Sequence, residues 1–420
     1  MLTAQTFPTI TVFTGISGID KKDFLKKLIK KSKMDKKVLL INFEDELIKE
    51  ERGLKKPIPN IPTFLNSTNG ALKLQIFSSN FSWIAKKIRE RKSSISEIFL
   101  NMHLSYYKNS EYYPPFIPLF FKEIFALLPD SKIRIITLID DIFVIWKKII
   151  DRENTSGYTN TKLNLKEILA WRSLEFLHGE ALKEHINISD EGSQRATHLM
   201  LSIRHPHETF HNLIFKKSDF RIYLSYHISE SRKTSQGINE INEFRKLMHS
   251  FGKKHQAVIY DPVAIDELAM VFALKNSRSK NKKIQTLTLR ENDRWPLDIG
   301  NLNTKKIKWP IKIPVIEIEQ VGDDINNQIK SRDYTLVDTA THLAVYRPYF
   351  NGKLSKGVDA EVKRANDNFS DVIVYHPKED QIKEGDTTHP FGDTITMFED
   401  KKEFIEHLQK LIKQHKRKDK

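Results

Sequence analysis

The stretch "TITVFTGISGIDKKDF" (residues 9–24) joins an apolar, β-branched run to a glycine-containing turn and then to a lysine-rich segment. β-Branched residues that end at a glycine are typical of a buried strand. After the turn, Phe24, Leu25, Leu28 and Ile29 recur at helical spacing, which predicts an amphipathic helix. A strand, a tight turn and a helix in this order form the repeating unit of a parallel α/β sheet.

The same alternation continues along the chain and restarts once, which predicts two domains. Further apolar strands are expected at residues 37–45, 96–104 and 132–141, and then at 219–229, 257–262, 342–350 and 371–377. We therefore expect two α/β domains, residues 1–217 and 218–420, each a mainly parallel sheet flanked by helices. The second domain carries a basic, irregular insertion at about residues 275–315.

Composition limits the classes of function. The 420 residues include no cysteine, which excludes disulfides, thiolate metal sites and cysteine nucleophiles. Neither a long uncharged apolar run nor a signal-peptide pattern is present, so we expect a cytoplasmic protein without a membrane span. The net charge of +15 favours anionic partners such as nucleotides or nucleic acid, although lysine-rich helix faces also explain it as solvated surface.

The glycine-containing turn resembles the phosphate-binding loop of P-loop NTPases and nucleotide kinases, in which backbone N–H groups wrap a phosphate. The residues that match the family's nucleotide-binding positions are Gly15, Gly18, Lys21 and, at the end of a later strand, Asp140 or Asp141. Two positions depart from the pattern, because Asp20 replaces the last glycine and Lys22 replaces the Mg²⁺-binding Ser or Thr. The resemblance implies a degenerate P-loop domain that binds ATP or GTP with Mg²⁺, or has lost this binding. The alternative is an α/β scaffold with a tight glycine turn.

The second half resembles the nucleoside 2-deoxyribosyltransferase-like family, which includes deoxynucleoside-monophosphate N-glycosidases. Four segments carry the resemblance: "RIYLSYHIS" (221–229), "YDP" (260–262), "RDYTLVDTATHLAVYRP" (332–348) and "GVDAEVKRA" (357–365). The family implies a flavodoxin-like or Rossmann-like sheet that binds a nucleoside at the carboxyl ends of its strands. It also implies a nucleophilic glutamate in a Gly-x-x-x-Glu segment, which Gly357 and Glu361 match, with Ser355 as the preceding hydroxylated residue.

The chemistry of N-glycosidic cleavage suits such a glutamate. Positive charge develops on the sugar as the bond breaks, and a carboxylate below the anomeric carbon traps it covalently. We expect Glu361 to be ionised, because a position near a helix N-terminus favours negative charge. Asp338 resembles an acid that the family places near the site, and Asp333 is the alternative; either would orient Glu361 or protonate the departing base. No metal or other cofactor is needed.

The resemblance also implies the groups that bind the substrate. Base or sugar contacts are expected from Tyr223, Ser225, Tyr226 and His227, a 5′-phosphate contact from Arg232, and phosphate and base contacts from Arg347 and Tyr349. Family members often complete their sites across a subunit interface, so we expect a homo-oligomer. The competing interpretation is that Glu361 lies on the surface and pairs with Arg364 one helical turn later.

"HETFH" (residues 207–211) matches the zinc motif H-E-x-x-H. It directly follows Pro206, where a helix would begin, and the sequence offers no convincing third ligand. We therefore interpret it as a connector with surface His and Glu side chains and predict no metal site.

The sequence thus predicts an enzyme that cleaves or exchanges the N-glycosidic bond of a nucleoside or nucleotide, in salvage or in antiviral defence. Three alternatives stay open. The first is a nucleotide kinase or NTPase that uses Lys21 and Asp140 or Asp141, with an inactive second domain. The second is a non-enzymatic regulator that binds nucleotide or nucleic acid. The third is an NAD glycohydrolase, which differs from the main prediction only in its substrate.

Overall fold

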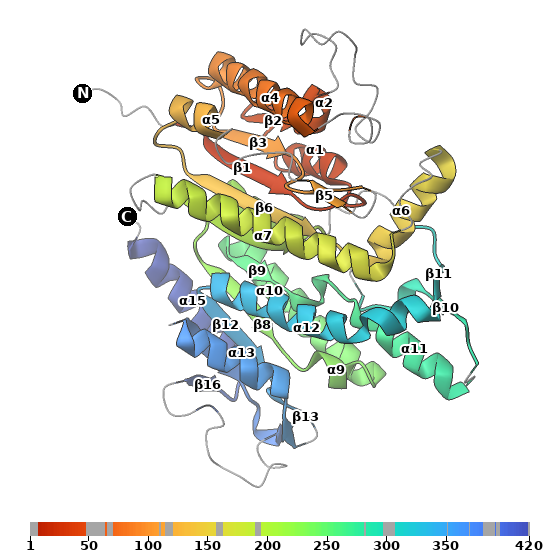
Figure 1. Ribbon diagram of the computed structural model, residues 1–420. Helices are drawn as coiled ribbons and strands as arrows, with labels where there is room; N and C mark the ends of the chain where they lie inside the picture. The colour runs from red at the N-terminus through yellow and green to blue at the C-terminus, as the bar shows by residue number, and fades with distance from the viewer. Residues whose placement is uncertain are drawn as a thin grey trace. The chain divides into compact units, whose positions relative to one another are not determined.

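The computed structural model confirms an α/β protein with two five-stranded parallel sheets (Figure 1). It describes residues 7–47, 64, 70–108, 111–113, 121–156, 163–189, 195–280, 283–296, 307–350, 352–368, 370–380, 391 and 395–418. Unit 1 comprises Met1–Ile203, Leu274–Leu289 and Asn303–Gly322, and unit 2 comprises Arg204–Ala273, Arg290–Leu302 and Asp323–Lys420. No helix in the described ranges combines the length and the apolar character that crossing a lipid bilayer requires.

The sheet of unit 1 has the strand order β2-β3-β1-β6-β7, and all of its strand pairs are parallel. Its strands are β1 (Thr9–Thr14), β2 (Val38–Asn42), β3 (Glu97–Asn101), β6 (Ile133–Ile139) and β7 (Ala196–Ser202). Every residue of the central strand β1 is buried, as its apolar, β-branched sequence predicts. Because β3 and β6 flank β1, the loops that follow these three strands meet at one edge of the sheet.

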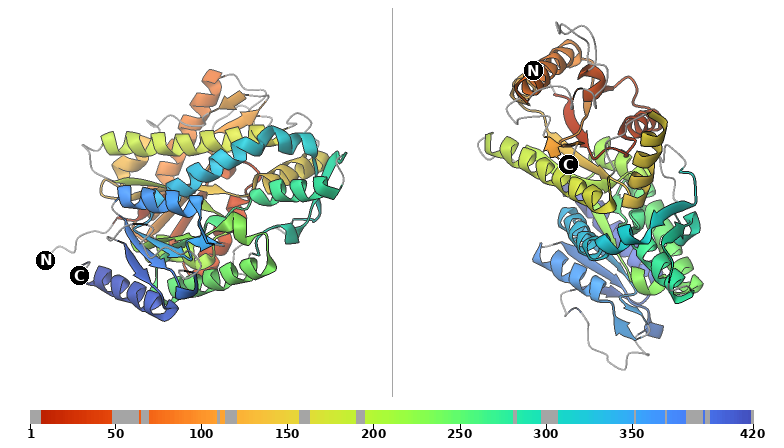
Figure 2. Two further views of the ribbon diagram at one scale, coloured as in Figure 1. Left: turned by 90° about the horizontal axis from the view of Figure 1, so that it is seen from below. Right: turned by 45° about the vertical axis from the view of Figure 1, so that its right-hand side comes forward.

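Helices cover both faces of this sheet. They are α1 (Lys21–Lys31), α2 (Phe43–Leu47), α4 (Gly70–Arg91), α5 (Lys122–Leu127), α6 (Ile142–Ser156) and α7 (Leu165–Ser189). Phe77 of α4, Ile124 of α5 and Leu182 of α7 share a buried core cluster with Ile10 of β1. The red helix α1 lies on the opposite side of the strands from the orange helix α4 (Figure 2, right). A short hairpin of β4 (Tyr106–Lys108) and β5 (Glu111–Tyr113) follows β3.

The sheet of unit 2 has the strand order β16-β15-β12-β8-β9 and is also entirely parallel. Its strands are β8 (Arg221–Ser225), β9 (Val258–Tyr260), β12 (His342–Tyr346), β15 (Asp371–Tyr375) and β16 (Thr396–Phe398). From β8 the chain first winds to β9 on one side and then crosses to β12 on the other. The boundary between β8 and β12 is therefore the switch point of the sheet, where open α/β sheets bind ligands beyond the carboxyl ends of their strands.

The two faces of this second sheet are covered by different helices. Its helices are α8 (His207–Ile214), α9 (Ile228–Ser231), α10 (Ser235–His255), α13 (Lys356–Asp367), α15 (Lys401–Lys418) and part of α12 (Val315–Thr339). Phe244 of α10 and Phe404 of α15 pack with Ile222 and Leu224 of β8 in one core cluster. Because strand side chains alternate between faces, Tyr223 and Ser225 point to the other face. Helix α13 lies against β12 and β15.

The predicted domain boundary at residues 217/218 differs from the observed division, which follows Ile203. Strand β7 ends the first sheet, and α8, predicted to close the first domain, packs within unit 2. There Thr209 Oγ1 donates a hydrogen bond to the carbonyl of Ile259, and Asn212 Nδ2 donates to those of Gly252 and Ala257.

The basic segment, which was predicted to be an irregular insertion of the second domain, also has a structure that differs from this prediction. Residues Leu274–Leu289 and Asn303–Gly322 belong to unit 1, and only the part between them belongs to unit 2. The segment contains the end of α11 (Leu268–Lys280) and an antiparallel pair, β10 (Thr286–Leu289) with β11 (Ile311–Pro314). Trp309, just before β11, packs against Phe143 of α6 at a ring-centroid distance of 6.4 Å. Alternate burial along β10 and β11 gives the segment a packed face, which its basic composition conceals.

Candidate functional site

The carboxylate of Glu361 is held inside unit 2 at the carboxyl end of β8. Tyr223 Oη donates a hydrogen bond of 2.8 Å to Glu361 Oε1, and Ser225 Oγ donates one of 2.5 Å to Oε2. The side chain of Glu361 is 9% exposed. The surface interpretation is therefore wrong, because Arg364 instead donates two hydrogen bonds of 2.6 Å to Asp338.

Local structure explains how these side chains meet. Ser225 is the last residue of β8, and Tyr223 lies two residues earlier on the same face of the strand. The neighbouring strand β12 pairs Leu343 with Tyr223 and Val345 with Ser225. Helix α13 begins after its N-cap residue Ser355, and Glu361 lies on its buried side. The sequence segments "RIYLS" and "GVDAE" are thus joined at the switch point of the sheet.

The ionisation of Glu361 differs from the prediction. Burial raises the pKa of its carboxyl to about 8, and the nearby charge of Asp333 adds to the rise, while the hydrogen bonds from Ser225 and Tyr223 oppose it. At pH 7 the group is therefore largely protonated. The helix N-terminus does not offset burial, because Glu361 lies beyond the first turn of α13, where the helix dipole has faded.

Asp333, rather than Asp338, is the acid beside Glu361. It is buried on α12 and accepts hydrogen bonds of 3.1 and 3.0 Å from Nε and Nη2 of Arg332. Burial raises the pKa of the Asp333 carboxyl; Arg332 opposes the rise, and the buried Glu267 adds to it. Asp338 is exposed, and its carboxylate is bound to Arg364 and Asn368. Asp333 and the buried Glu267 thus both lie near the guanidinium of Arg332, and sequence reasoning named neither Arg332 nor Glu267.

Tyr226, the residue that directly follows β8, belongs to the core cluster of unit 2. Tyr226 Oη donates a hydrogen bond of 2.6 Å to Asp261, which also accepts from Arg245 at 2.8 Å and His249 at 3.1 Å. Burial acts to raise the pKa of the Asp261 carboxyl, but the positive charge of Arg245, together with the hydrogen bonds to this carboxyl, outweighs it. The pKa of Asp261 therefore lies well below its ordinary value. Tyr226, predicted to contact base or sugar, therefore supports a buried ionic network.

His227 and Tyr349 make aromatic contacts around the hairpin of β13 (Tyr349–Phe350) and β14 (Lys353–Leu354), which leads into α13. His227 packs against Phe350 at 4.9 Å between ring centroids, and its Nδ1 contacts Ser231 Oγ. Tyr349 stacks on His376 at 5.2 Å. The hairpin therefore anchors the segment that carries Glu361.

The two arginines predicted to bind phosphate already have carboxylate partners. Arg232 pairs with the buried Asp266, and its guanidinium lies 5.5 Å from the ring centroids of both Phe272 and Trp295. Arg347 has a φ of +46° and pairs with Asp380 and Glu240. Both predictions overlooked acids that are distant in the sequence.

Gly357 and Ser355 lie at the start of α13. Gly357 is exposed, and a Cβ placed there would find only Ser355 Oγ, at 4.0 Å. Neither its backbone conformation nor its surroundings therefore require glycine at this position.

In unit 1, packing accounts for the glycines of the predicted phosphate loop. Gly15 and Gly18 have φ values of +138° and +92°. A Cβ on Gly15 would lie 2.4 Å from the carbonyl oxygen of Leu138, and one on Gly18 would lie 2.9 Å from Cγ2 of Ile145. The glycines are therefore required for close contact with β6 and α6, whether or not a phosphate binds.

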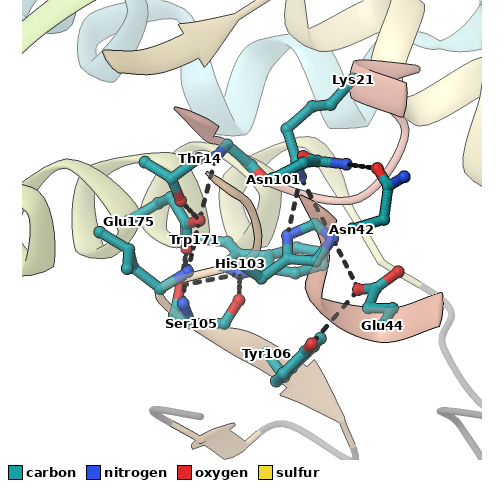
Figure 3. A network of polar contacts seen from close by, with 12 residues as sticks. Thr14, Lys21, Asn42, Glu44, Asn101, His103, Ser105, Tyr106, Trp171 and Glu175 are labelled. Atoms are coloured by element: carbon teal, nitrogen blue, oxygen red, sulfur yellow. Dashed lines mark hydrogen bonds and ion pairs between the residues drawn. The ribbon is translucent and has the colours of Figure 1, made fainter. Parts of the chain in front are cut away.

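Lys21 turns toward its own loop and the end of β3 (Figure 3). Its Nζ donates to the carbonyl of Gly15 and lies 3.1 Å from Nδ1 of His103, whose Nε2 is 3.2 Å from Glu44 Oε1. Tyr106 Oη donates to the same Glu44 oxygen at 3.3 Å. Burial lowers the pKa of the Lys21 amine to about 8.

The acidic residues predicted around the loop contact α6. Asp20 forms ion pairs of 3.1 Å with Lys148 and 2.9 Å with Arg152, so the residue that replaces the last glycine ties the loop to this helix. Asp140 and Asp141 are buried, and Asp140 Oδ2 lies 3.9 Å from Lys148. The amide of Asp141 donates to Asp140 Oδ1 at 2.9 Å.

Helix α8 begins at His207, with Pro206 as its N-cap. The rings of His207 and His211 lie 5.4 Å apart, and Glu208 lies 3.7 Å from His207 Nδ1. His207 is buried rather than on the surface, contrary to the prediction. Within the described ranges, no group of three His, Asp or Glu side chains is arranged to hold a metal ion.

A scan against protein-family models gives no match to this chain, and a search of curated protein sequences gives none either.

Proposed function

We propose that unit 2 cleaves or exchanges the N-glycosidic bond of a nucleoside or nucleotide, with Glu361 as the nucleophile. The observation that carries this proposal is a single glutamate, buried at the switch point of a parallel sheet, with both carboxyl oxygens bound by hydroxyl donors. Within the unit, the chain order of the strands across the sheet is 2-1-3-4-5, the order of flavodoxin-like folds. This order supports the proposed relation to nucleoside deoxyribosyltransferases.

The reaction proceeds in two displacements. An oxygen of ionised Glu361 attacks the anomeric carbon, the C–N bond breaks, and its electron pair stays on the base nitrogen, which takes a proton from Asp333. Water, or a second base, then attacks the anomeric carbon of the glycosyl ester and loses a proton to Asp333. The ester bond breaks and Glu361 is released as the carboxylate.

The surroundings of the two carboxyl groups, Asp333 and Glu361, suit these roles. Asp333 must be protonated when the base leaves, and burial favours its protonated form. Glu361 must lose its proton before it attacks, and the hydrogen bonds from Tyr223 and Ser225 stabilise the ionised form. Positive charge that develops on the sugar stabilises the carboxylate further, so the pKa of Glu361 falls as the transition state forms.

The test measures free base by chromatography after incubation with nucleosides, nucleotides, deoxynucleotides and NAD. Wild-type protein and Glu361→Gln are compared, with Glu243→Gln as the matched control because Glu243 is an exposed glutamate on α10. We expect free base from wild type and Glu243→Gln but none from Glu361→Gln. Release that persists in folded Glu361→Gln, or no release by the wild type from any substrate, would contradict the proposal. Release from NAD alone would identify the glycohydrolase alternative.

A further inference from the structure

Unit 1 contains a buried carboxylate that neither the predicted phosphate loop nor the proposed reaction involves. Glu175 of α7 is 0% exposed. It accepts hydrogen bonds from the amides of Gly15 at 3.0 Å, Leu104 at 2.8 Å and Ser105 at 2.6 Å. The hydroxyls of Thr14 and Ser105 donate to it as well. Five donors therefore converge on one side chain.

These donors come from one edge of the sheet. Thr14 ends β1, Gly15 follows it, and Leu104 and Ser105 lie in the loop after the neighbouring strand β3. Two successive backbone N–H groups that point at one anion form the kind of nest that binds phosphate in many proteins. The carboxyl ends of central strands are also where doubly wound sheets bind their ligands. Figure 3 shows the carboxylate of Glu175 beside Thr14 and Ser105 in this position.

The loop lysine has partners without a bound phosphate. Lys21 Nζ bonds to the carbonyl of Gly15 and contacts His103. The negative charges of Glu175 and Glu44 both favour its charged form. Gly15 thus links the two groups, because its amide donates to Glu175 while its carbonyl accepts from Lys21. The loop conformation is fixed by protein groups alone.

We propose that Glu175 is the built-in occupant of an oxyanion site in unit 1, and that its carboxylate takes the place that a phosphate group would occupy. Unit 1 then keeps its loop ordered without nucleotide. Removal of this side chain exposes a nest suited to a small tetrahedral oxyanion such as inorganic phosphate or sulfate. This inference does not depend on the reaction proposed for unit 2.

The test compares wild type, Glu175→Ala and Glu184→Ala by thermal unfolding with increasing phosphate or sulfate. Glu184 is the control because it lies on the same helix, is 60% exposed and pairs with Lys183. We expect Glu175→Ala to be less stable and to bind phosphate at least about tenfold more tightly than wild type, because its amide donors then lack a charged acceptor. Folded Glu175→Ala that gains no affinity for phosphate or sulfate would overturn the proposal.

Calorimetry on the wild-type chain keeps the proposal testable if Glu175→Ala does not fold. Wild type is titrated with phosphate and with Mg²⁺·ATP, and Lys21→Ala is titrated in parallel. The proposal predicts that the wild type shows no saturable binding that depends on Lys21. Binding of either ligand by the wild type that Lys21→Ala abolishes would show that a nucleotide phosphate displaces Glu175, and would overturn it.

Discussion

Tyr223 donates a hydrogen bond of 2.8 Å to Glu361, although 138 positions separate the two residues in the chain. Ser225, two residues later on the same strand, holds the second carboxyl oxygen. Two hydroxyl groups of one strand thus hold both oxygens of a buried glutamate that a distant helix carries. This arrangement distinguishes Glu361 from a surface glutamate and is the basis of its proposed role as nucleophile.

Removal of either hydroxyl donor should move the pH dependence of catalysis. Both hydrogen bonds stabilise ionised Glu361, so Tyr223→Phe and Ser225→Ala should raise its pKa further and shift the acidic limb of the kcat/KM profile to higher pH. We expect base release at pH 7 to fall by about tenfold, which corresponds to a pKa rise of about one unit. The control is Tyr226→Phe, whose lost hydroxyl binds Asp261 instead. A profile that moves as much in Tyr226→Phe would argue against a specific role for the two donors.

The wild-type protein should release base faster as the pH rises toward 8 if Glu361 is the nucleophile. Glu361 must be ionised to attack, its pKa is about 8, and below that value the ionised fraction falls by about tenfold for each pH unit. The measurement is initial-rate base release from pH 5.5 to 10, and the apparent pKa values belong to the coupled pair of carboxyl groups. A rate that stays constant between pH 6 and 8 would contradict the assignment.

The sequence predicted the architecture well where strands are continuous apolar runs. β7 (Ala196–Ser202) was missed because Thr197 and His198 interrupt its apolar pattern. His198 is nevertheless accommodated, since its ring nitrogens contact Thr137 at 2.8 Å and Glu180 at 2.7 Å. Such partners come from other elements, and periodicity within one segment cannot reveal them.

The same limit applies to the site. The Gly-x-x-x-Glu segment located Glu361, but its pKa depends on burial and on Asp333 of α12, which only the folded structure brings near. Arg232 read as a free cation in the sequence, while the fold gives it Asp266 as a partner. Glu175 carried no signal at all, because its donors lie in loops 70 and 160 positions away.

Asp333 and Asp338 should differ sharply when each is changed to asparagine. Asp333→Asn removes the buried proton donor, so base release should fall by about 100-fold or more, and most for the poorest leaving groups. Asp338→Asn only weakens an exposed pair with Arg364 and should leave the rate nearly unchanged. Rates with substrates of graded leaving-group pKa provide the measurement. Equal losses in both variants would remove Asp333 from its proposed role.

Glu361→Gln should stabilise unit 2 at alkaline pH. The pKa of Glu361 rises from 4.5 to about 8 in the folded protein, so the folded state holds an extra proton between these values. Stability therefore falls as the pH rises through this window, and glutamine removes the loss. We expect the gain in Tm over wild type to be about 8–16 °C larger at pH 9 than at pH 5, because the difference of about three pH units corresponds to about 4 kcal/mol. Glu243→Gln should show the same difference from wild type at both pH values, and a pH-independent effect of Glu361→Gln would refute the shifted pKa.

The central claim is that Glu361 forms a covalent glycosyl ester, and the stereochemistry of the product tests it most directly. The wild-type protein is given a substrate from which it releases base, in buffer that contains methanol, and the methyl glycoside is analysed by nuclear magnetic resonance. Two displacements at the anomeric carbon predict that the methyl glycoside retains the configuration of the substrate. A product with inverted configuration would show a single displacement by solvent and would contradict the role of Glu361 as nucleophile.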